Sequence, residues 1–153
     1  AKEHVAKIKR CIRTMKEKCR CTVSTLPFEV LPKLVVINIV YHEVMWANAF
    51  PNKKGVSETF SPRALILRNN LDVTLHAKYD FCQYGEVADE PEPSNTMVER
   101  MQGALYVGST GNIQGSMKFF LLKSARVVRR RQFTPLDMPA KVITRVNAIG
   151  RRT

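Results

Sequence analysis

Apolar residues near the start of the chain recur at alternating steps of three and four positions. This spacing places them on one side of an α-helix, which we expect to run from about Glu3 to about Val23 and to bury that side. Pro27 ends the helix, because proline lacks a backbone donor and restricts the residue before it. The residues of this apolar side are Val5, Ile8, Ile12, Met15 and Cys19.

A second helical pattern begins after Pro32 and reads KLVVINIVYHEVMWANAF, which is apolar on nearly every side. Such a helix is typical of an element enclosed between others, so we expect the helix over 34–50 to be sandwiched. A short third helix is predicted at Ser61-Pro62, which fits an N-cap followed by proline in the first turn, and it should end near 67–69.

From residue 71 to residue 133 the sequence pattern changes from helical spacing to strand-like segments and turns. Residues 71–87 are irregular with strand-like pieces, and 89–95 (DEPEPSN) have the composition of a linker. Three strands separated by short turns then predict a β-meander, a small barrel-like unit in which Gly108, Gly111 and Gly115 serve turns. The expected strands cover 103–108, 113–122 and 127–133.

A last helix is predicted near the end of the sequence. Asp137-Met138-Pro139 should cap it, Val142, Val146 and Ile149 share one side of it, and Gly150 should end it. Helices followed by a run of strands and one more helix indicate an α+β fold.

The charge of the chain limits its partners. The 153 residues carry a net charge of +12 with a pI near 9.9, which attracts polyanions such as nucleic acid. Residues 1–33 hold nine Lys or Arg against three acids, and 123–131 hold five with none, whereas acidic residues gather within 86–99. Two basic blocks therefore flank an acidic linker.

Each basic block supplies candidate binding residues. Lys9, Arg10, Arg13 and Lys16 on the first helix could follow DNA phosphates, with a solvated surface helix as the alternative. Arg129, Arg130 and Arg131 on the third strand form the second candidate, since alternation must leave at least one of them exposed. The alternative there is a charged edge strand that prevents aggregation.

The four cysteines favour a reducing, intracellular compartment. Their spacing forms no disulfide framework and we expect no signal peptide before them. Cys19 and Cys21 could form half of a zinc site with His42 or His76, but the spacing of a four-ligand site is missing, so we interpret the cysteines as small apolar side chains. The longest apolar run, Leu34–Val40, is too short to cross a bilayer, so we expect no membrane partner.

Several short motifs occur together in a fixed order. They are LPF (26–28), WANAFP (46–51), FSPR (60–63), EPSNTM (92–97), GSTGNIQG (108–115) and RRQFTPLDMPAKVITRVN (130–147). On these motifs, which span nearly the whole chain, the sequence resembles the integrase region of copia-type long-terminal-repeat retrotransposon polyproteins. No single motif would be specific, but their number and order are.

The resemblance implies a DNA strand-transfer enzyme with an RNase H-like core, in which two Asp and one Glu hold two Mg²⁺ or Mn²⁺ ions. In the family the Glu lies in a pattern like EIERFIRTIKER, and this sequence reads KIKRCIRTMKEK over 7–18, so Lys9 stands at the position of the Glu. An ammonium group cannot ligate a metal, and we expect the two aspartates upstream of this segment. The resemblance thus implies no catalytic residue and no cofactor in this chain, although an intact integrase would use Mg²⁺ or Mn²⁺.

The implied organisation has three parts. Residues 1–70 are the last helices of the integrase core and a connector, 71–100 an irregular connector with the acidic linker, and 101–153 a small SH3-like, β-rich DNA-binding unit with a terminal helix. The implied function is sequence-independent DNA binding in support of DNA integration, in the nucleus or a cytoplasmic particle. The expected partners are duplex DNA and either a second copy or an upstream integrase core.

Two alternatives remain open from the sequence. The chain could be a domesticated transposon remnant that acts as a protein-interaction module through its apolar helix at 34–50. It could also be an active nuclease or transferase that recruits other acids, with Asp72, Asp80, Glu86 and the acids of 89–93 as candidates.

Overall fold

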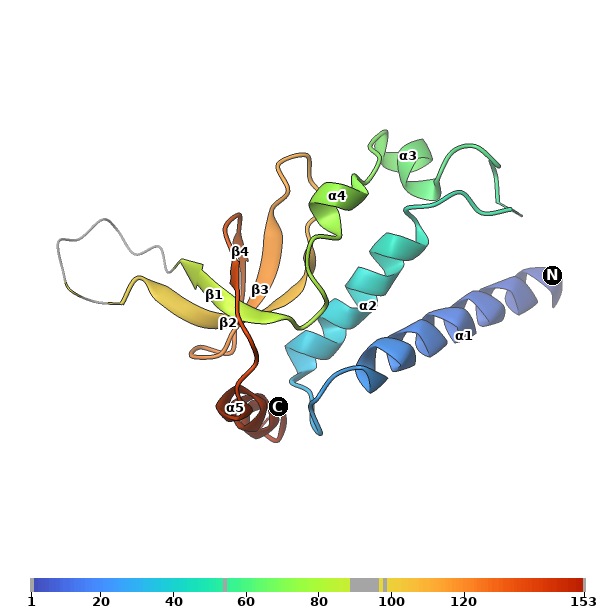
Figure 1. The fold of residues 1–153 in the computed structure, drawn as a ribbon. Coiled ribbons are helices and arrows are strands. Elements are labelled where there is room, and N and C mark those ends of the chain that lie inside the picture. The colour runs from blue at the N-terminus through green and yellow to red at the C-terminus, as the bar shows by residue number, and fades with distance from the viewer. Residues whose placement is uncertain (1, 54, 89–96, 98, 153) are drawn as a thin grey trace. The chain divides into compact units, whose positions relative to one another are not determined.

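The computed structural model describes residues 2–53, 55–88, 97 and 99–152. Within these ranges the chain forms five helices and one open, antiparallel five-stranded sheet (Figure 1), which confirms the expected α+β class. The contacts divide the chain into two compact units, one of 1–26 with 39–71 and one of 27–38 with 72–153. Helix α2 supplies residues to both units.

The first unit is helical. It contains α1 (Lys2–Ser24), the C-terminal part of α2 (Lys33–Ala47) and α3 (Pro62–Leu67). The second half of α1 contacts α2, since the Thr22 hydroxyl donates a 2.6 Å hydrogen bond to the Glu43 carboxylate. Burial, and secondarily the charge of Glu43, raises the pKa of the nearby Cys19 thiol. The bounds of α1 agree closely with those predicted.

The apolar side of α1 is covered over part of its length only. Met15 and Cys19 are half-buried, whereas Val5, Ile8 and Ile12 are 50%, 60% and 50% exposed. The expectation that this side is buried is therefore wrong for the first half of the helix. The second half keeps its cover because α2 packs there.

Helix α2 differs from the enclosed helix that the sequence suggests. Val35 and Ile39 are buried, but Val36, Val40 and Val44 are exposed. The expectation of a helix sandwiched on all sides is wrong within the described chain, because other segments cover the side with Val35 and Ile39 and leave the side with Val36, Val40 and Val44 open.

Helix α3 follows the predicted capping pattern. The Ser61 hydroxyl accepts a 3.1 Å hydrogen bond from the amide of Ala64, and Pro62 occupies the first turn, where its missing donor costs nothing. The helix ends at Arg68, whose φ of 52° lies in the left-handed region.

The second unit is built on the sheet. Its strands are β1 (Tyr84–Ala88), β2 (Met101–Ser109), β3 (Met117–Leu121), β4 (Val127–Arg130) and β5 (Thr134–Pro135), in the order β4-β3-β2-β1-β5. The predicted three-strand meander is confirmed as β2, β3 and β4. Strands β1 and β5 extend it on the far side of β2, and a short helix, α4 (Val73–His76), precedes β1.

Strand β3 is shorter than predicted because residues 113–116 belong to the preceding turn. Gly111 and Gly115 have φ values of 70° and 66°, which a strand does not use, and Ile113 is 83% exposed. Phe133, predicted within the strand over 127–133, lies beyond β4 but is buried.

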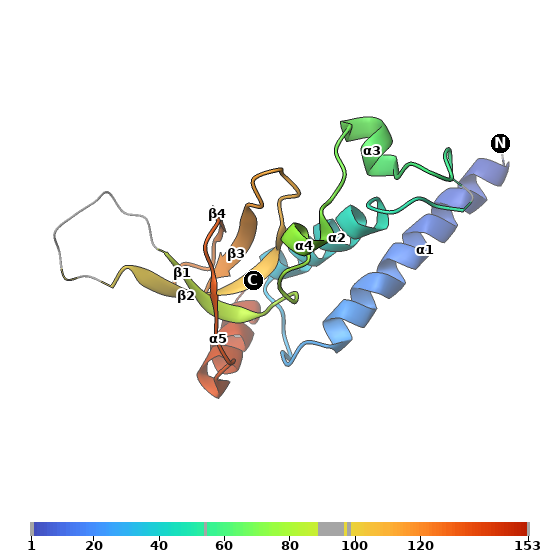
Figure 2. The ribbon, with the colours of Figure 1, turned by 45° about the horizontal axis from the view of Figure 1, so that its top comes forward.

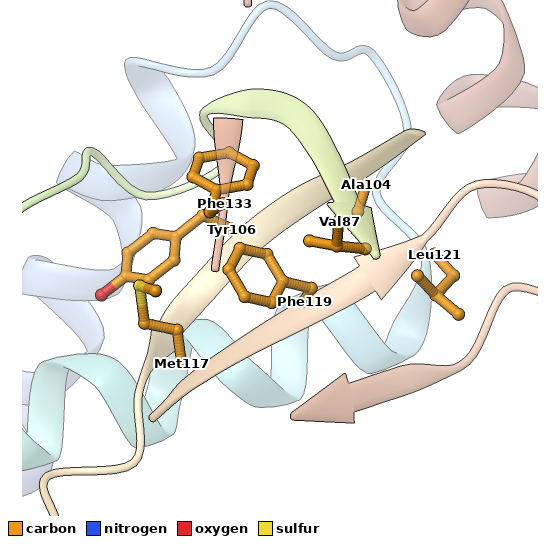
Figure 3. Packing of buried hydrophobic residues seen from close by; sticks show 7 residues of the cluster. All are labelled: Val87, Ala104, Tyr106, Met117, Phe119, Leu121 and Phe133. Atoms are coloured by element: carbon orange, nitrogen blue, oxygen red, sulfur yellow. The ribbon is translucent and has the colours of Figure 1, made fainter. Parts of the chain in front are cut away.

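An apolar cluster covers one side of the sheet (Figure 3). Phe119 lies at its centre, with its ring centroid 5.9 Å from that of Tyr106 and 4.9 Å from that of Phe133. Tyr79 adds edge contacts to Tyr106 and Phe133. The cluster contains Val87, Ala104, Tyr106, Met117, Phe119, Leu121 and Phe133. The opposite side is buried as well, at Leu105, Val107 and Phe120, so β2 and β3 are nearly continuous in apolar residues.

Helix α5 (Ala140–Gly150) lies beside the strands in both views (Figures 1 and 2). Val142, Val146 and Ile149, which were predicted to share one side of the helix, are all buried. The predicted side-chain cap is wrong, because Pro139 occupies the N-cap position and has no side-chain acceptor.

Asn147 and Gly150 join α5 to residues 29–30. The Asn147 side-chain oxygen accepts hydrogen bonds from the amides of Glu29 (3.0 Å) and Val30 (3.2 Å). The helix ends at Gly150, as predicted, and Arg151 follows it as a C-cap in a right-handed conformation. The glycine also permits close packing, since a Cβ there would lie 2.6 Å from the Val30 carbonyl oxygen.

Gly85 in β1 offers a test of the sheet edge. A Cβ at this position would overlap the Thr134 carbonyl oxygen and the Phe133 ring, so Gly85→Ala should push β5 away and lower the free energy of unfolding by about 1–3 kcal/mol. Urea unfolding of the full chain measures this. Gly103→Ala is the matched control, because its Cβ would meet the movable Tyr84 hydroxyl at 3.1 Å. Equal stability of the two variants would contradict the packing at β5.

Candidate nucleic-acid interface

Helix α1 presents a row of cations to solvent. Lys9, Arg13 and Lys16 follow one another at steps of four and three, so they share one side of the helix, and Arg10 lies beside them. All four side chains are exposed. The ion pairs found in the described part of the chain, Arg20–Glu17 at 3.1 Å and Arg151–Glu29 at 3.3 Å, include none of these four. The row is therefore available to an anionic partner.

The same helix does not fit a two-metal site. Lys9 is an exposed cation, and the described residues contain no group of three or more His, Cys, Asp or Glu that could hold a metal. Hard cations such as Mg²⁺ need several oxygen ligands, which an ammonium group cannot supply and would repel. The described part of the chain thus offers Mg²⁺ or Mn²⁺ no suitable set of oxygen ligands.

The three arginines of the second basic block differ from one another in exposure and in hydrogen-bond partners. Arg129 is exposed on the edge strand β4 and pairs across the sheet with Lys118. Arg130 is half-buried, and its guanidinium donates to the carbonyl oxygens of Ala88 and Arg129, both at 2.9 Å. Arg131 follows the strand and donates to the Gln114 side-chain oxygen at 2.5 Å.

These arginines border a hollow of about 490 Å³ at the sheet edge. Beside it, Lys118 and Arg129 form a like-charged cross-strand pair, which destabilises a sheet when nothing offsets it. Partial burial, and then the charge of Arg129, lowers the pKa of Lys118. An anion bound at this edge would relieve the repulsion. The hollow is lined by Ala88, Ser116, Arg129, Arg130, Arg131 and Gln132.

Sequence reasoning missed part of the basic surface in the second unit. Lys118 lay inside a predicted strand and was not singled out. Arg145 on α5 donates to the carbonyl oxygens of Leu122 (3.1 Å) and Lys123 (3.4 Å), which brings the basic side of α5 next to the β3–β4 turn. The helical spacing of Lys141, Arg145 and Arg152 was the available signal.

The two predicted basic blocks belong to different units. The α1 cations lie in the first unit and Arg129–Arg131 in the second. We therefore treat them as two separate candidate surfaces.

The zinc hypothesis finds no support in the geometry around His76. Its Nδ1 lies 2.8 Å from the Asp72 carbonyl oxygen and its Nε2 2.8 Å from the Asn112 carbonyl oxygen, so both ring nitrogens already have backbone partners. These contacts tie α4 to the turn before β3. All four cysteines are free thiols.

The described acids that were considered as substitute catalysts either have hydrogen-bond partners already or lie in separate segments of the chain. Asp72 caps α4 by accepting from the Thr74 amide and hydroxyl, and these bonds lower the pKa of its carboxyl group. Glu86 lies in β1 opposite Gly103, and Asp80 is in the loop before that strand. The acids of 89–93 lie outside the described residues.

Comparison with protein-family models, curated proteins and solved structures finds no match to this chain. Within the described ranges, no helix has the length and apolar character required to cross a membrane.

The thiols should differ sharply in reactivity. Burial raises the pKa of Cys82 to about 12, whereas Cys11 and Cys21 are exposed. Because the thiolate is the reactive form, a disulfide reagent at about pH 8 should label Cys11 and Cys21 quickly and Cys82 only after denaturation. Peptide mapping by mass spectrometry distinguishes the sites. Fast labelling of Cys82 in the native chain would contradict the packing of the second unit.

Proposed function

We propose that this chain is a segment of a copia-type retrotransposon integrase that binds duplex DNA through its phosphates and supports DNA integration, without catalysing strand transfer by itself. The ordered motifs from LPF at 26–28 to RRQFTPLDMPAKVITRVN at 130–147 support the family. Lys9, at the position of the family's metal-binding Glu, supports the loss of catalysis.

The observation that carries DNA binding is the exposed row Lys9, Arg10, Arg13 and Lys16 on α1, which has no ion-pair partner among the described acids. Like charges held on one helix repel one another and destabilise it. A phosphate backbone removes that repulsion and releases its own counterions, which favours binding at low salt. Phosphates carry no base identity, so the binding is independent of sequence.

The second unit supports an SH3-like interpretation of the β-rich part. The order β4-β3-β2-β1-β5 brings the last strand back beside the first. Arg130 also reaches from β4 to the carbonyl oxygen of Ala88 in β1, although two strands lie between them in the sheet order. This contact fits a sheet that curls toward a small barrel. Arg129 and Lys118 at its edge provide the second phosphate-binding surface.

A protein-interaction module is the second candidate function. The exposed apolar residues of α2, including Val36, Val40 and Val44, favour it, because monomeric proteins seldom leave such a surface uncovered. A second copy of the chain or an upstream integrase core would cover this surface. In either case the site of action is the nucleus or a cytoplasmic particle.

DNA binding should depend steeply on salt and little on sequence. With about four to six phosphate contacts, log affinity against log salt should have a slope of roughly −4 to −5, and scrambled duplexes should bind within a few-fold of one another. Fluorescence anisotropy of labelled duplexes across a salt series measures both quantities.

Alanine substitutions test which cations contact the DNA phosphates. Arg10→Ala with Arg13→Ala should weaken binding to every duplex and flatten the slope by about two contacts. Lys53→Ala with Lys78→Ala is the matched control, because it removes the same charge from exposed positions outside both candidate surfaces. Affinity that does not change with salt, or no binding at low salt, would remove the DNA proposal and leave the interaction module.

A further inference from the structure

Helix α1 carries a heptad repeat along its apolar side. In heptad positions a to g, Val5, Ile12 and Cys19 occupy a, and Ile8, Met15 and Thr22 occupy d. From Val5 to Met15 the branched or long apolar side chains lie at a and d only, which is the narrow seam of a helix pair, whereas a helix on a sheet or on a lipid surface shows a wider apolar side. The seam therefore fits another helix.

Half of this seam is already used within the first unit. Thr22 at position d donates its hydrogen bond to Glu43 of α2. The charge of Glu43 also contributes, after burial, to the raised pKa of the Cys19 thiol at position a. The other half, at Val5, Ile8 and Ile12, has β-branched side chains that are at least half exposed. The part of the seam that is covered is thus covered by a helix that supplies an acidic residue.

The charges beside the open half define what can bind there. Lys9 and Lys16 occupy the flanking e positions and Lys18 a g position, and no acid occupies an e or g position over 5–18. Residues at e and g set partner choice in helix pairs, and like charges there oppose pairing. A second copy of α1 has no acid at the positions that would face these lysines, so charge does not favour it as the partner.

We propose that the open half of α1 binds an acidic amphipathic helix of another protein, which has apolar residues at its own a and d positions and Glu or Asp beside them. The apolar rows pack together, and the partner's carboxylates pair with Lys9, Lys16 and Lys18. This inference does not rest on DNA binding: Lys9 and Lys16 belong to both surfaces, but Arg10 and Arg13 lie at positions f and b, away from the seam.

The test uses the full chain and a synthetic helical peptide of about three heptads, with Ile at a, Leu at d and Glu at e and g. Isothermal titration calorimetry should give saturable one-to-one binding. A control peptide with Lys at e and g should bind at least about tenfold more weakly, because it places like charges beside the seam. No binding of the acidic peptide, or equal binding of the two peptides, would overturn the proposal.

Neutral substitutions separate the seam from general charge attraction. Ile8→Gln with Ile12→Gln should weaken peptide binding at least about tenfold yet leave the salt slope of DNA binding unchanged. Arg10→Ala with Arg13→Ala should do the reverse. Val56→Gln with Ile66→Gln is the matched control, since these apolar residues of the same unit are 98% and 80% exposed. Circular dichroism checks that every variant keeps its helices.

Other occupants would give different results. Sedimentation equilibrium that shows a dimer abolished by Ile8→Gln with Ile12→Gln would assign the seam to a second copy. Binding to phosphatidylserine vesicles that the same pair abolishes, without binding of the acidic peptide, would assign it to a lipid surface. Either result would overturn the proposal, whereas peptide binding lost only in this variant supports it.

Discussion

The second unit depends on the packing of Phe119 against the rings of Tyr106 and Phe133. These three residues come from β3, from β2 and from the segment before β5, and Tyr79 links two of them from the segment before β1. Aromatic edge contacts of this kind add to the effect of buried area. They explain why the two-residue strand β5 can hold its place beside β1, which its few hydrogen bonds could not achieve alone.

Burial on both sides of the sheet determines where charge can lie. In the second unit, Arg129 and Arg130 lie on the edge strand β4, Lys118 on the neighbouring strand β3 and Arg145 on α5, whereas the first unit carries its row of cations along α1. With a net charge of +12, the cations repel one another and destabilise the folded chain. An anionic partner reduces this repulsion, whether its charges are phosphates or carboxylates.

The sequence predicted the elements whose signals are local. The three-and-four spacing of α1, the Ser61-Pro62 start of α3, the buried side of α5 and the three-strand meander all depend on neighbouring residues. Strand β1 was foreseen only as a strand-like piece within 71–87 and β5 was missed, because both are short and are held by distant partners. The same reason applies to the candidate site: exposure of Lys9 to Lys16 follows from the helix, whereas the bond from Arg130 to Ala88 and the pairing of Lys118 with Arg129 depend on the register of the sheet.

The bonds from Asn147 to the amides of Glu29 and Val30 join positions 118 and 117 residues apart. Strands β2, β3 and β4 follow one another through short turns and can pair as soon as they leave the ribosome. The second unit can close only after residue 147 has been synthesised, because its first segment must wait for its last helix. During that interval the amides of Glu29 and Val30 lack the side-chain acceptor that they have in the folded chain, and water must take its place.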